Sequence, residues 1–206
     1  MWTFGCNLRC RFCYNRDLVL NVGKGISEDN ILEDLRSMQI KNIVITGGEP
    51  LIQEDILNFL IKLRELNFSV KLDTNGFLPE KLLKIIDSKL INYIAVDLKG
   101  LNDTDIKYIT RSKYRLADLL KTIDIINQTG IDYELRYTAW KNYNKEEIQE
   151  FIEMLNVKKG CKLFIQQIYG NNFLDKTFNP HVTQEEILNM QKHFEYFIPC
   201  KIRAKS

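Results

Sequence analysis

The sequence has no long apolar stretch and almost no net charge. No run approaches the 18 or more consecutive apolar residues of a membrane helix, and residues 1–4 form neither the basic head nor the apolar core of a signal peptide. Lys and Arg number 29 against 27 Asp and Glu, which gives a formal net charge of +2. We therefore expect a cytoplasmic protein that binds neither a membrane nor a nucleic-acid backbone.

Linkers, low-complexity tracts and strong repeats are also missing from the 206 residues, of which 45% are apolar. A chain of this length buries roughly 70% of its unfolded surface, so it can fold without disulfides or a structural metal. We predict a single domain over residues 1–206. The five cysteines are an odd number, and three lie within residues 6–13, which favours reduced thiols or metal ligands over a disulfide framework.

Short β-branched segments alternate with amphipathic segments along the whole chain. The predicted strands cover residues 41–46, 69–73, 93–98, 132–138 and 162–168, with a truncated strand at 2–4. The predicted helices begin behind the N-cap Ser27 and after Pro50, and cover about residues 79–87, 116–128, 145–155 and 183–197. Because parallel neighbours need a crossover connection, this alternation predicts an α/β protein with a parallel sheet, either doubly wound or a TIM-like barrel.

The most informative segment is a cysteine-rich loop after the first short strand, in which Cys6, Cys10 and Cys13 have the spacing C-x3-C-x2-C. Structural zinc needs four ligands, and neither a His nor a fourth Cys is nearby; a ferredoxin-type cluster also has four cysteines. Zinc and purely structural thiols remain weaker alternatives. Three cysteines on a four-iron cluster leave one iron open for a chelating molecule. We interpret the isolated Cys161 and Cys200 as buried free thiols.

Polar residues end or follow the other predicted strands. They are Gly47-Gly48-Glu49-Pro50, Asp73-Thr74-Asn75-Gly76, Asp97-Leu98-Lys99-Gly100, Arg136 with Thr138, and Gln167. Each set alone is typical of an ordinary turn or of solvated charges. Together they place polar groups at the carboxyl ends of different strands, which is the edge where barrels carry their active sites.

The pattern C-x3-C-x-aromatic-C, with Phe12 at the aromatic position, resembles the signature of the radical S-adenosylmethionine (radical SAM) superfamily. This resemblance implies a partial (β/α)6 TIM-like barrel in which Cys6, Cys10 and Cys13 hold a [4Fe-4S] cluster whose fourth iron binds S-adenosylmethionine. It also implies reductive cleavage of S-adenosylmethionine to a 5′-deoxyadenosyl radical. By the same resemblance Phe12 lies near the adenine, although it is equally typical of a packing aromatic. Gly47, Gly48 and Glu49 would then bind the methionyl amino group.

Within that superfamily, residues 4–203 resemble the glycyl-radical-enzyme activating proteins, especially activators of anaerobic ribonucleoside-triphosphate reductase. Residues 13–17 are similar to their C-H-N-x-(D/E) run, with Tyr14 in place of His, and residues 71–76, 96–99 and 132–138 also resemble counterparts there. The residues that this resemblance assigns to S-adenosylmethionine binding include Asp73, Asn75, Asp97, Lys99 and Arg136. Asp73, Thr74 and Asp97 would also hold Na+ or K+, and Gln167 stands where formate-lyase activases have a His near the ribose.

The resemblance implies two partners, a glycyl-radical enzyme as protein substrate and a flavodoxin- or ferredoxin-like electron donor. Two other classes stay open. One is a small-molecule enzyme resembling 7-carboxy-7-deazaguanine synthase, in which Asp-Thr follows the third cysteine where this chain has Tyr14-Asn15. The other is a non-catalytic iron-sulfur or scaffold protein. Only five residues precede Cys6, so we expect a truncated first strand or a misassigned start codon.

Overall fold

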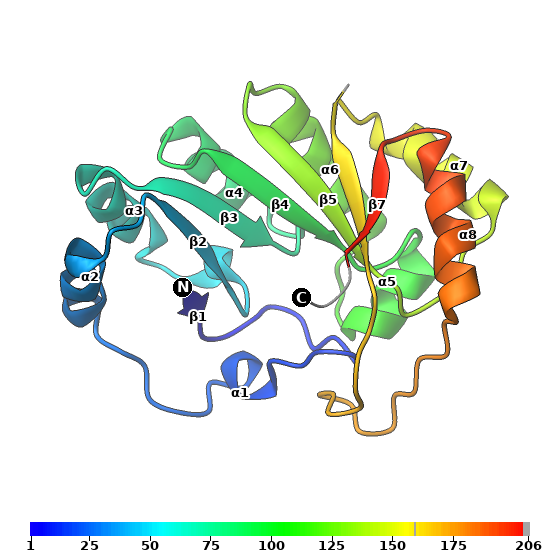
Figure 1. The fold of residues 1–206 in the computed structure, drawn as a ribbon, viewed down its shortest axis with the longest axis horizontal. Coiled ribbons are helices and arrows are strands. Elements are labelled where there is room, and N and C mark those ends of the chain that lie inside the picture. Colours follow the sequence, from blue (N-terminus) through cyan, green and yellow to red (C-terminus); the bar gives the residue numbers. More distant parts are fainter. Residues whose placement is uncertain (159, 204–206) are drawn as a thin grey trace.

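A single curved sheet of seven parallel strands forms the centre of the computed structural model, which describes residues 1–158 and 160–203 (Figure 1). The strands are β1 (Trp2–Thr3), β2 (Asn42–Gly47), β3 (Ser69–Thr74), β4 (Tyr93–Leu98), β5 (Asp132–Thr138), β6 (Lys162–Gln166) and β7 (Cys200–Arg203). Each strand pairs in parallel with the next one along the chain. A doubly wound sheet would reverse its strand order at a switch point, so the order observed is that of a barrel.

The barrel is partial. Among the described residues β1 and β7 are the two edges of the sheet and do not pair with each other. The six predicted strands are present, and β7 was missed because it has only four residues, two of them basic. β1 is as short as expected, and β6 ends at Gln166, so Gln167 lies just beyond it.

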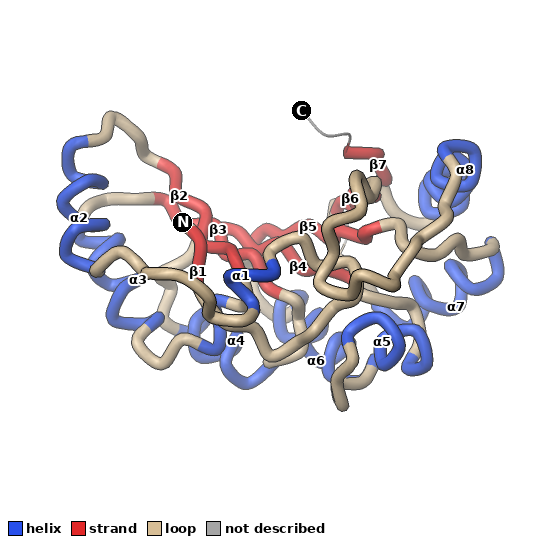
Figure 2. Tube along the Cα trace, turned by 90° about the horizontal axis from the view of Figure 1, so that it is seen from below, coloured by secondary structure: helices blue, strands red, loops and turns tan. Residues whose placement is uncertain are grey.

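The helices are α1 (Arg16–Val19), α2 (Glu28–Ser37), the 3-10 turn η1 (Pro50–Ile52), α3 (Ile56–Glu65), α4 (Pro79–Asp87), α5 (Asp103–Thr110), α6 (Leu116–Asn127), α7 (Lys145–Leu155) and α8 (Gln184–Glu195). Most of them cover the outer side of the sheet (Figure 2), whereas α1 lies apart from the strands in Figure 1. The expected caps are confirmed: the Ser27 side chain accepts from Asn30 N at 3.3 Å, and Thr183 with Glu186 forms a capping box. Helices α1 and α5 were not predicted from the sequence. None of the described helices is long and apolar enough to cross a membrane.

The two faces of the sheet differ in chemistry because successive side chains of a strand point to opposite faces. The buried outer-face residues include Ile43, Ile45, Val70, Leu72, Ile94, Val96, Leu135, Tyr137, Leu163 and Ile165. On β3 the residues between them are Lys71 and Asp73, and on β5 they are Glu134 and Arg136. The helices pack against the apolar outer face, and the polar inner face is the one that can form a functional site.

Candidate cofactor site

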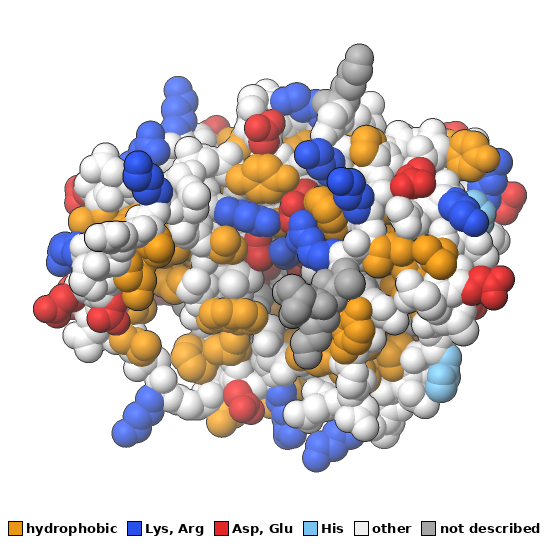
Figure 3. All heavy atoms as spheres, viewed as in Figure 1, with side chains coloured by type: hydrophobic (Ala, Val, Ile, Leu, Met, Phe, Trp, Pro, Cys, Tyr) orange, Lys and Arg blue, Asp and Glu red, His pale blue; other side chains and the backbone are white. Residues whose placement is uncertain are grey.

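A cavity of about 420 Å³ lies at the carboxyl ends of the strands. Every site residue expected from the sequence lines it: Cys6, Cys10, Phe12, Cys13, Gly47, Gly48, Glu49, Asp73, Thr74, Asn75, Asp97, Lys99, Arg136 and Gln167. The concave face around it gathers basic and acidic side chains near its centre (Figure 3). The structure therefore brings together residues from the cysteine loop and from five strand ends, although the role of each residue stays a prediction.

The cysteine loop is held by elements that lie far away in the sequence. The main-chain nitrogens of Arg9 and Arg11 donate to the carbonyls of Thr110 and Ile109 at the end of α5, both at 2.9 Å. On its other side, the loop accepts main-chain hydrogen bonds from residues 174 and 175. The loop thus depends on α5, which explains why this unpredicted helix matters for the site.

Asp175 completes this support, and sequence reasoning missed it. Its buried carboxylate accepts from Arg11 Nη1 at 2.6 Å and also pairs with Arg111. No local motif marks Asp175, since its partners lie 164 and 64 residues earlier. Only the path of the chain after β6 places it against the loop.

The three thiols fit a cluster better than a single metal ion. Cys10 is buried, and Cys6 and Cys13 are half-buried at the cavity wall. Burial raises the pKa of the Cys6 thiol to about 11 and that of Cys10 to about 12, so the thiolates need positive charge beside them. No three His, Cys, Asp or Glu side chains of residues 1–158 and 160–203 are placed to hold one metal ion. A cluster fits this arrangement because each cysteine binds a different iron.

Gly47 and Gly48 let the end of β2 approach the start of the cysteine loop. A Cβ on Gly48 would lie 1.7 Å from the carbonyl oxygen of Gly5, and one on Gly47 would lie 2.3 Å from Thr3 N. Main-chain bonds of 2.9 Å run from Gly48 N to Thr3 O and from Glu49 N to Gly5 O. Contacts within the protein itself therefore require glycine at both positions.

Glu49 is fully buried and ties β2 to the turn after β3. Its carboxylate accepts from Thr74 Oγ1 at 2.8 Å, Asn75 N at 2.7 Å and Leu51 N at 3.2 Å. Burial raises the pKa of Glu49 to about 7, although these three donors oppose the shift. Both oxygens already have partners within the protein, so the expected contact with a methionyl amino group stays a prediction.

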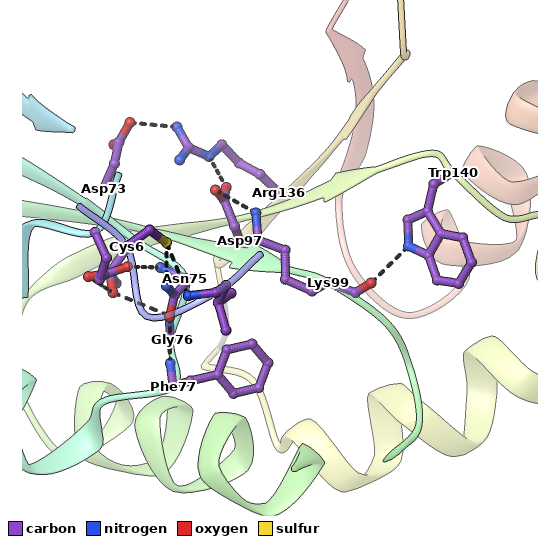
Figure 4. Close-up of polar contacts among 12 residues, drawn as sticks. Cys6, Asp73, Asn75, Gly76, Phe77, Asp97, Lys99, Arg136 and Trp140 are labelled. Carbon is purple, nitrogen blue, oxygen red and sulfur yellow. Dashed lines mark hydrogen bonds and ion pairs between the residues drawn. The ribbon is translucent and has the colours of Figure 1, made fainter. Parts of the chain in front are cut away.

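Asn75 lies directly beside Cys6 (Figure 4). Its Nδ2 donates to Asn7 Oδ1 at 2.7 Å and is 4.0 Å from Cys6 Sγ, and its Oδ1 accepts from Phe77 N at 3.1 Å. The turn after β3 is therefore in contact with the first cysteine. Gly76 in this turn has a φ of 77°, as the Asn-Gly pair predicts.

Arg136 and Lys99 surround the carboxylate of Asp97. Arg136 Nε is 2.6 Å from Asp97 Oδ1, and Lys99 Nζ is 3.1 Å from Asp97 Oδ2. Burial opposes ionisation of Asp97, but the two cations outweigh it and lower its pKa to about 2. Arg136 Nη1 also contacts Asp73 Oδ2 at 2.8 Å.

Lys99 is positioned from its main chain as well. Trp140 Nε1 donates to the Lys99 carbonyl at 2.8 Å (Figure 4), and Lys99 Nζ lies 5.6 Å from the centroid of the Phe12 ring. Phe12 is buried and at the same time lines the cavity, which is compatible with packing and with an adenine contact. Gln167 Oε1 accepts from Tyr169 OH at 3.1 Å.

Thr74 lines the same cavity as Asp73 and Asp97, although its hydroxyl is engaged elsewhere, and the expected cation site stays a prediction. Thr74 and Asp73 are neighbours on β3, so their side chains point to opposite faces of the sheet. The Thr74 hydroxyl donates to Glu49 and accepts from Gly76 N at 3.2 Å. Of the three residues, the structure brings only Asp73 and Asp97 around a shared positive group, which is Arg136.

Residues 1–155 match the family model of the Radical SAM superfamily. The chain belongs to this superfamily, whose cofactors are a [4Fe-4S] cluster and S-adenosylmethionine. It is 31% identical to a Methanocaldococcus jannaschii protein provisionally named as a glycyl-radical enzyme activating enzyme, with 96% of this chain and 85% of that protein covered. A GTP 3′,8-cyclase of Helicobacter pylori is 29% identical, and the match covers 90% of this chain but 59% of the cyclase.

Two solved structures share the fold. Streptococcus suis SuiB bound to S-adenosylmethionine superimposes with a TM-score of 0.70 at 17% identity, covering 99% of this chain and 49% of SuiB. A domain of pyruvate-formate lyase-activating enzyme from Bacteroides vulgatus gives 0.59 at 15% identity, covering 78% of this chain and 98% of that domain. The chain thus spans about half of SuiB and less than two thirds of the cyclase.

Proposed function

We propose that this protein is a radical SAM activating enzyme that generates a glycyl radical on a partner enzyme. The observation that carries the proposal is the match to the Methanocaldococcus jannaschii protein, which covers 96% of this chain and 85% of that protein. The cyclases are matched over only 59% of their length. Similarity that extends along most of both chains favours a shared activity more than similarity to one part of a longer enzyme.

Within this proposal, the partner is anaerobic ribonucleoside-triphosphate reductase, and a flavodoxin- or ferredoxin-like protein supplies the electron. The residues that support this choice are the activase-like run from Cys13 to Asp17 and the segments 71–76 and 96–99. Cys13 and Asn15 line the cavity, so part of this run lies where a substrate would approach.

The shape of the site supports a protein substrate. The cavity is lined by residues from β1 at one edge of the sheet and from β6 next to the other edge, and these edges do not close on each other in the described chain. Trp2 and Tyr14 line the cavity and are 59% and 46% exposed, which leaves aromatic surface around its mouth. An extended loop that carries a glycine can enter such an open site, whereas a small substrate is normally enclosed.

When bound, the [4Fe-4S] cluster would supply the electron for reductive cleavage of S-adenosylmethionine, the chemistry that would remove a hydrogen atom from the glycine Cα. The chain's own residues prepare this step. Cys6, Cys10 and Cys13 would hold the cluster at the cavity wall, and Lys99 with Arg136 would supply positive charge near a carboxylate ligand. The α5 contacts and Asp175 would keep the cysteine loop in place.

A small-molecule radical SAM reaction is the second candidate, because several GTP 3′,8-cyclases are 25–29% identical over about 90% of this chain. The residues that follow the third cysteine also leave the 7-carboxy-7-deazaguanine synthase-like class open, although Tyr14-Asn15 differs from its Asp-Thr. In both cases the substrate would be a free heterocycle.

One experiment separates the two candidates. The reduced, cluster-loaded protein is mixed anaerobically with S-adenosylmethionine and the anaerobic reductase of the same genome, and the mixture is examined by electron paramagnetic resonance. We expect a glycyl doublet that disappears when the target glycine of the reductase is replaced by Ala. Absence of the doublet, together with conversion of a free heterocycle, would support the second candidate.

A further inference from the structure

Residues of the cysteine loop alternate between the cavity and the outer surface. Leu8, Cys10 and Phe12 are buried and line the cavity. Arg9 and Arg11 stand between them, lie outside the cavity lining and reach solvent, with the side chain of Arg11 25% exposed. The loop therefore presents a cysteine to the cavity on one side and two guanidinium groups to solvent on the other.

Further basic side chains surround these two arginines. Arg111 at the end of α5 is 43% exposed and shares the carboxylate of Asp175 with Arg11. Lys107 lies one helical turn before Arg111, and Lys176 directly follows Asp175; both lysines are exposed. We define the basic loop face as Arg9, Arg11, Lys107, Arg111 and Lys176.

The positive charge of the basic loop face is only partly balanced. Asp175 contacts two of the five cations, and its side chain is 6% exposed. Within residues 1–158 and 160–203, Arg9, Lys107 and Lys176 take part in no ion pair. The face is thus a local concentration of positive charge on a chain whose formal net charge is only +2. Such a patch attracts a partner of opposite charge.

An exposed aromatic ring lies among these cations. Tyr108 is 48% exposed, and the guanidinium carbon of Arg11 is 4.4 Å from the centroid of its ring. The centroid of the buried Trp140 ring is 5.8 Å from that of Tyr108, which supports the tyrosine from within the protein. Tyr and Arg are enriched in the energetically important parts of protein interfaces. The composition of the face is therefore that of a protein-docking surface.

The basic loop face lies directly behind the cysteines. Arg9 Nη1 donates to the carbonyl oxygens of Cys6 at 2.7 Å and Leu8 at 2.8 Å, so its guanidinium lies against the main chain that carries the first cysteine. Electron transfer slows steeply with distance, which requires a donor to approach the cysteines closely. A donor on this face would do so without covering Trp2 and Tyr14, which line the cavity and stand exposed at its mouth.

We propose that the basic loop face is the docking surface for the electron donor, an acidic electron-transfer protein of the flavodoxin or ferredoxin type. Opposite charges steer the encounter and orient the donor against the loop. One electron leaves the reduced centre of the donor, which is oxidised by one electron, and enters the [4Fe-4S] cluster, which is reduced by one electron. The inference rests on the donor named in the proposed function, but not on the substrate that finally loses a hydrogen atom.

The first test measures binding. An acidic flavodoxin and an acidic ferredoxin, both oxidised, are titrated separately into the cluster-loaded protein by anaerobic calorimetry. The test variant is Lys107→Glu with Lys176→Glu, which leaves the ion pairs of Asp175 in place. The matched control is Lys41→Glu with Lys81→Glu, which makes the same change in net charge at two exposed lysines, one before β2 and one in α4.

We expect the test variant to bind the donor at least about tenfold more weakly, and the control to bind it nearly as well as the unmodified chain. Equal affinity in all three proteins would overturn the proposal. Equal weakening in both double variants would also overturn it, because net charge and not this face would then govern binding. The same holds if the unmodified chain binds neither donor.

The second test compares two sources of electrons. The yield of 5′-deoxyadenosine is followed with the reduced donor protein and, separately, with dithionite, and the glycyl-radical enzyme is left out, so a missing glycyl doublet has no bearing on the result. The test variant should lose at least about tenfold in the donor-driven rate and keep the dithionite-driven rate. Equal loss with both reductants would indicate damage to the loop and would overturn the proposal.

Added salt tests the unmodified chain without any variant. The donor-driven rate should fall as the ionic strength rises, because salt screens exposed charges, whereas the dithionite-driven rate should change little. A donor-driven rate that is independent of salt would overturn the proposal, and this measurement decides if the test variant does not fold.

Discussion

The carboxylate of Asp175 accepts a hydrogen bond of 2.6 Å from Nη1 of Arg11, which lies 164 residues earlier in the chain. Arg11 is also in contact with α5, because its Nε donates to the Tyr108 carbonyl at 2.9 Å. Arg111, at the end of α5, pairs with the same carboxylate. The segment after β6, the end of α5 and the cysteine loop are therefore joined at one buried acid.

We predict that Asp175→Ala loosens the cysteine loop. The substitution leaves Arg11 and Arg111 side by side without their shared counter-charge. Iron content after reconstitution should fall, and the cluster should be lost severalfold faster in air. Asp124→Ala, on the exposed side of α6, is the control and should behave like the unmodified protein. Equal iron content and equal cluster lifetime in both variants would contradict this role.

Replacement by Ala should abolish cleavage of S-adenosylmethionine at the three motif cysteines but not at the other two cysteines. Replacement of Cys6, Cys10 or Cys13 by Ala should abolish cleavage of S-adenosylmethionine, because no spare cysteine stands within the loop. Cys161→Ala and Cys200→Ala should keep the cluster and the cleavage, since both thiols are buried and neither lines the cavity. Iron analysis and the yield of 5′-deoxyadenosine measure these outcomes. A Cys10→Ala variant with a full cluster and activity would exclude the assignment.

Gly48→Ala should strongly destabilise the fold. The added methyl group would meet the Gly5 carbonyl at 1.7 Å, and two main-chain segments would have to separate. We expect a loss of about 3 kcal/mol in the free energy of unfolding, at the upper end of the usual range for overpacking. Gly130→Ala is the matched control, because a Cβ at this position would meet no atom within 4 Å and its φ is not positive. Urea unfolding of both cluster-free variants checks the prediction, and equal stability of the two would refute it.

The buried Glu49 should make stability depend on pH. Its pKa rises from 4.5 to about 7 on folding, so the folded state binds the proton more tightly than the unfolded state. The contribution of Glu49 to the free energy of unfolding should therefore be highest below pH 4.5 and fall by about 3 kcal/mol as the pH rises through 7.

Glu49→Gln isolates this effect because the amide is neutral at every pH. Urea unfolding of the cluster-free protein between about pH 5 and about pH 8 should show a downward slope that the variant lacks. Asp97 does not change the slope of stability in this pH range, since its pKa is about 2. Parallel pH profiles for the two proteins would show that Glu49 is ionised throughout.

Local patterns in the sequence were enough to predict most of the elements. The alternation of apolar and polar residues in strands such as Ser69–Thr74 has period two and depends on neighbouring residues only. The spacing of Cys6, Cys10 and Cys13 is likewise local. The short strand Cys200–Arg203 escaped prediction because four residues carry too little pattern. Helix α5 escaped it although Asn102 caps it by accepting from Asp105 N at 2.9 Å.

The sequence by itself determined a parallel α/β fold, a cysteine loop and a set of polar residues at strand ends, because strand direction alone brings those ends to one edge. Only the tertiary structure decided which of these residues contact each other. Arg136 reaches Asp73 across β4, and Thr74 turns away to Glu49. Such contacts depend on side-chain length and on the face of the strand, and they join residues that are 63 and 25 positions apart, so no local pattern records them.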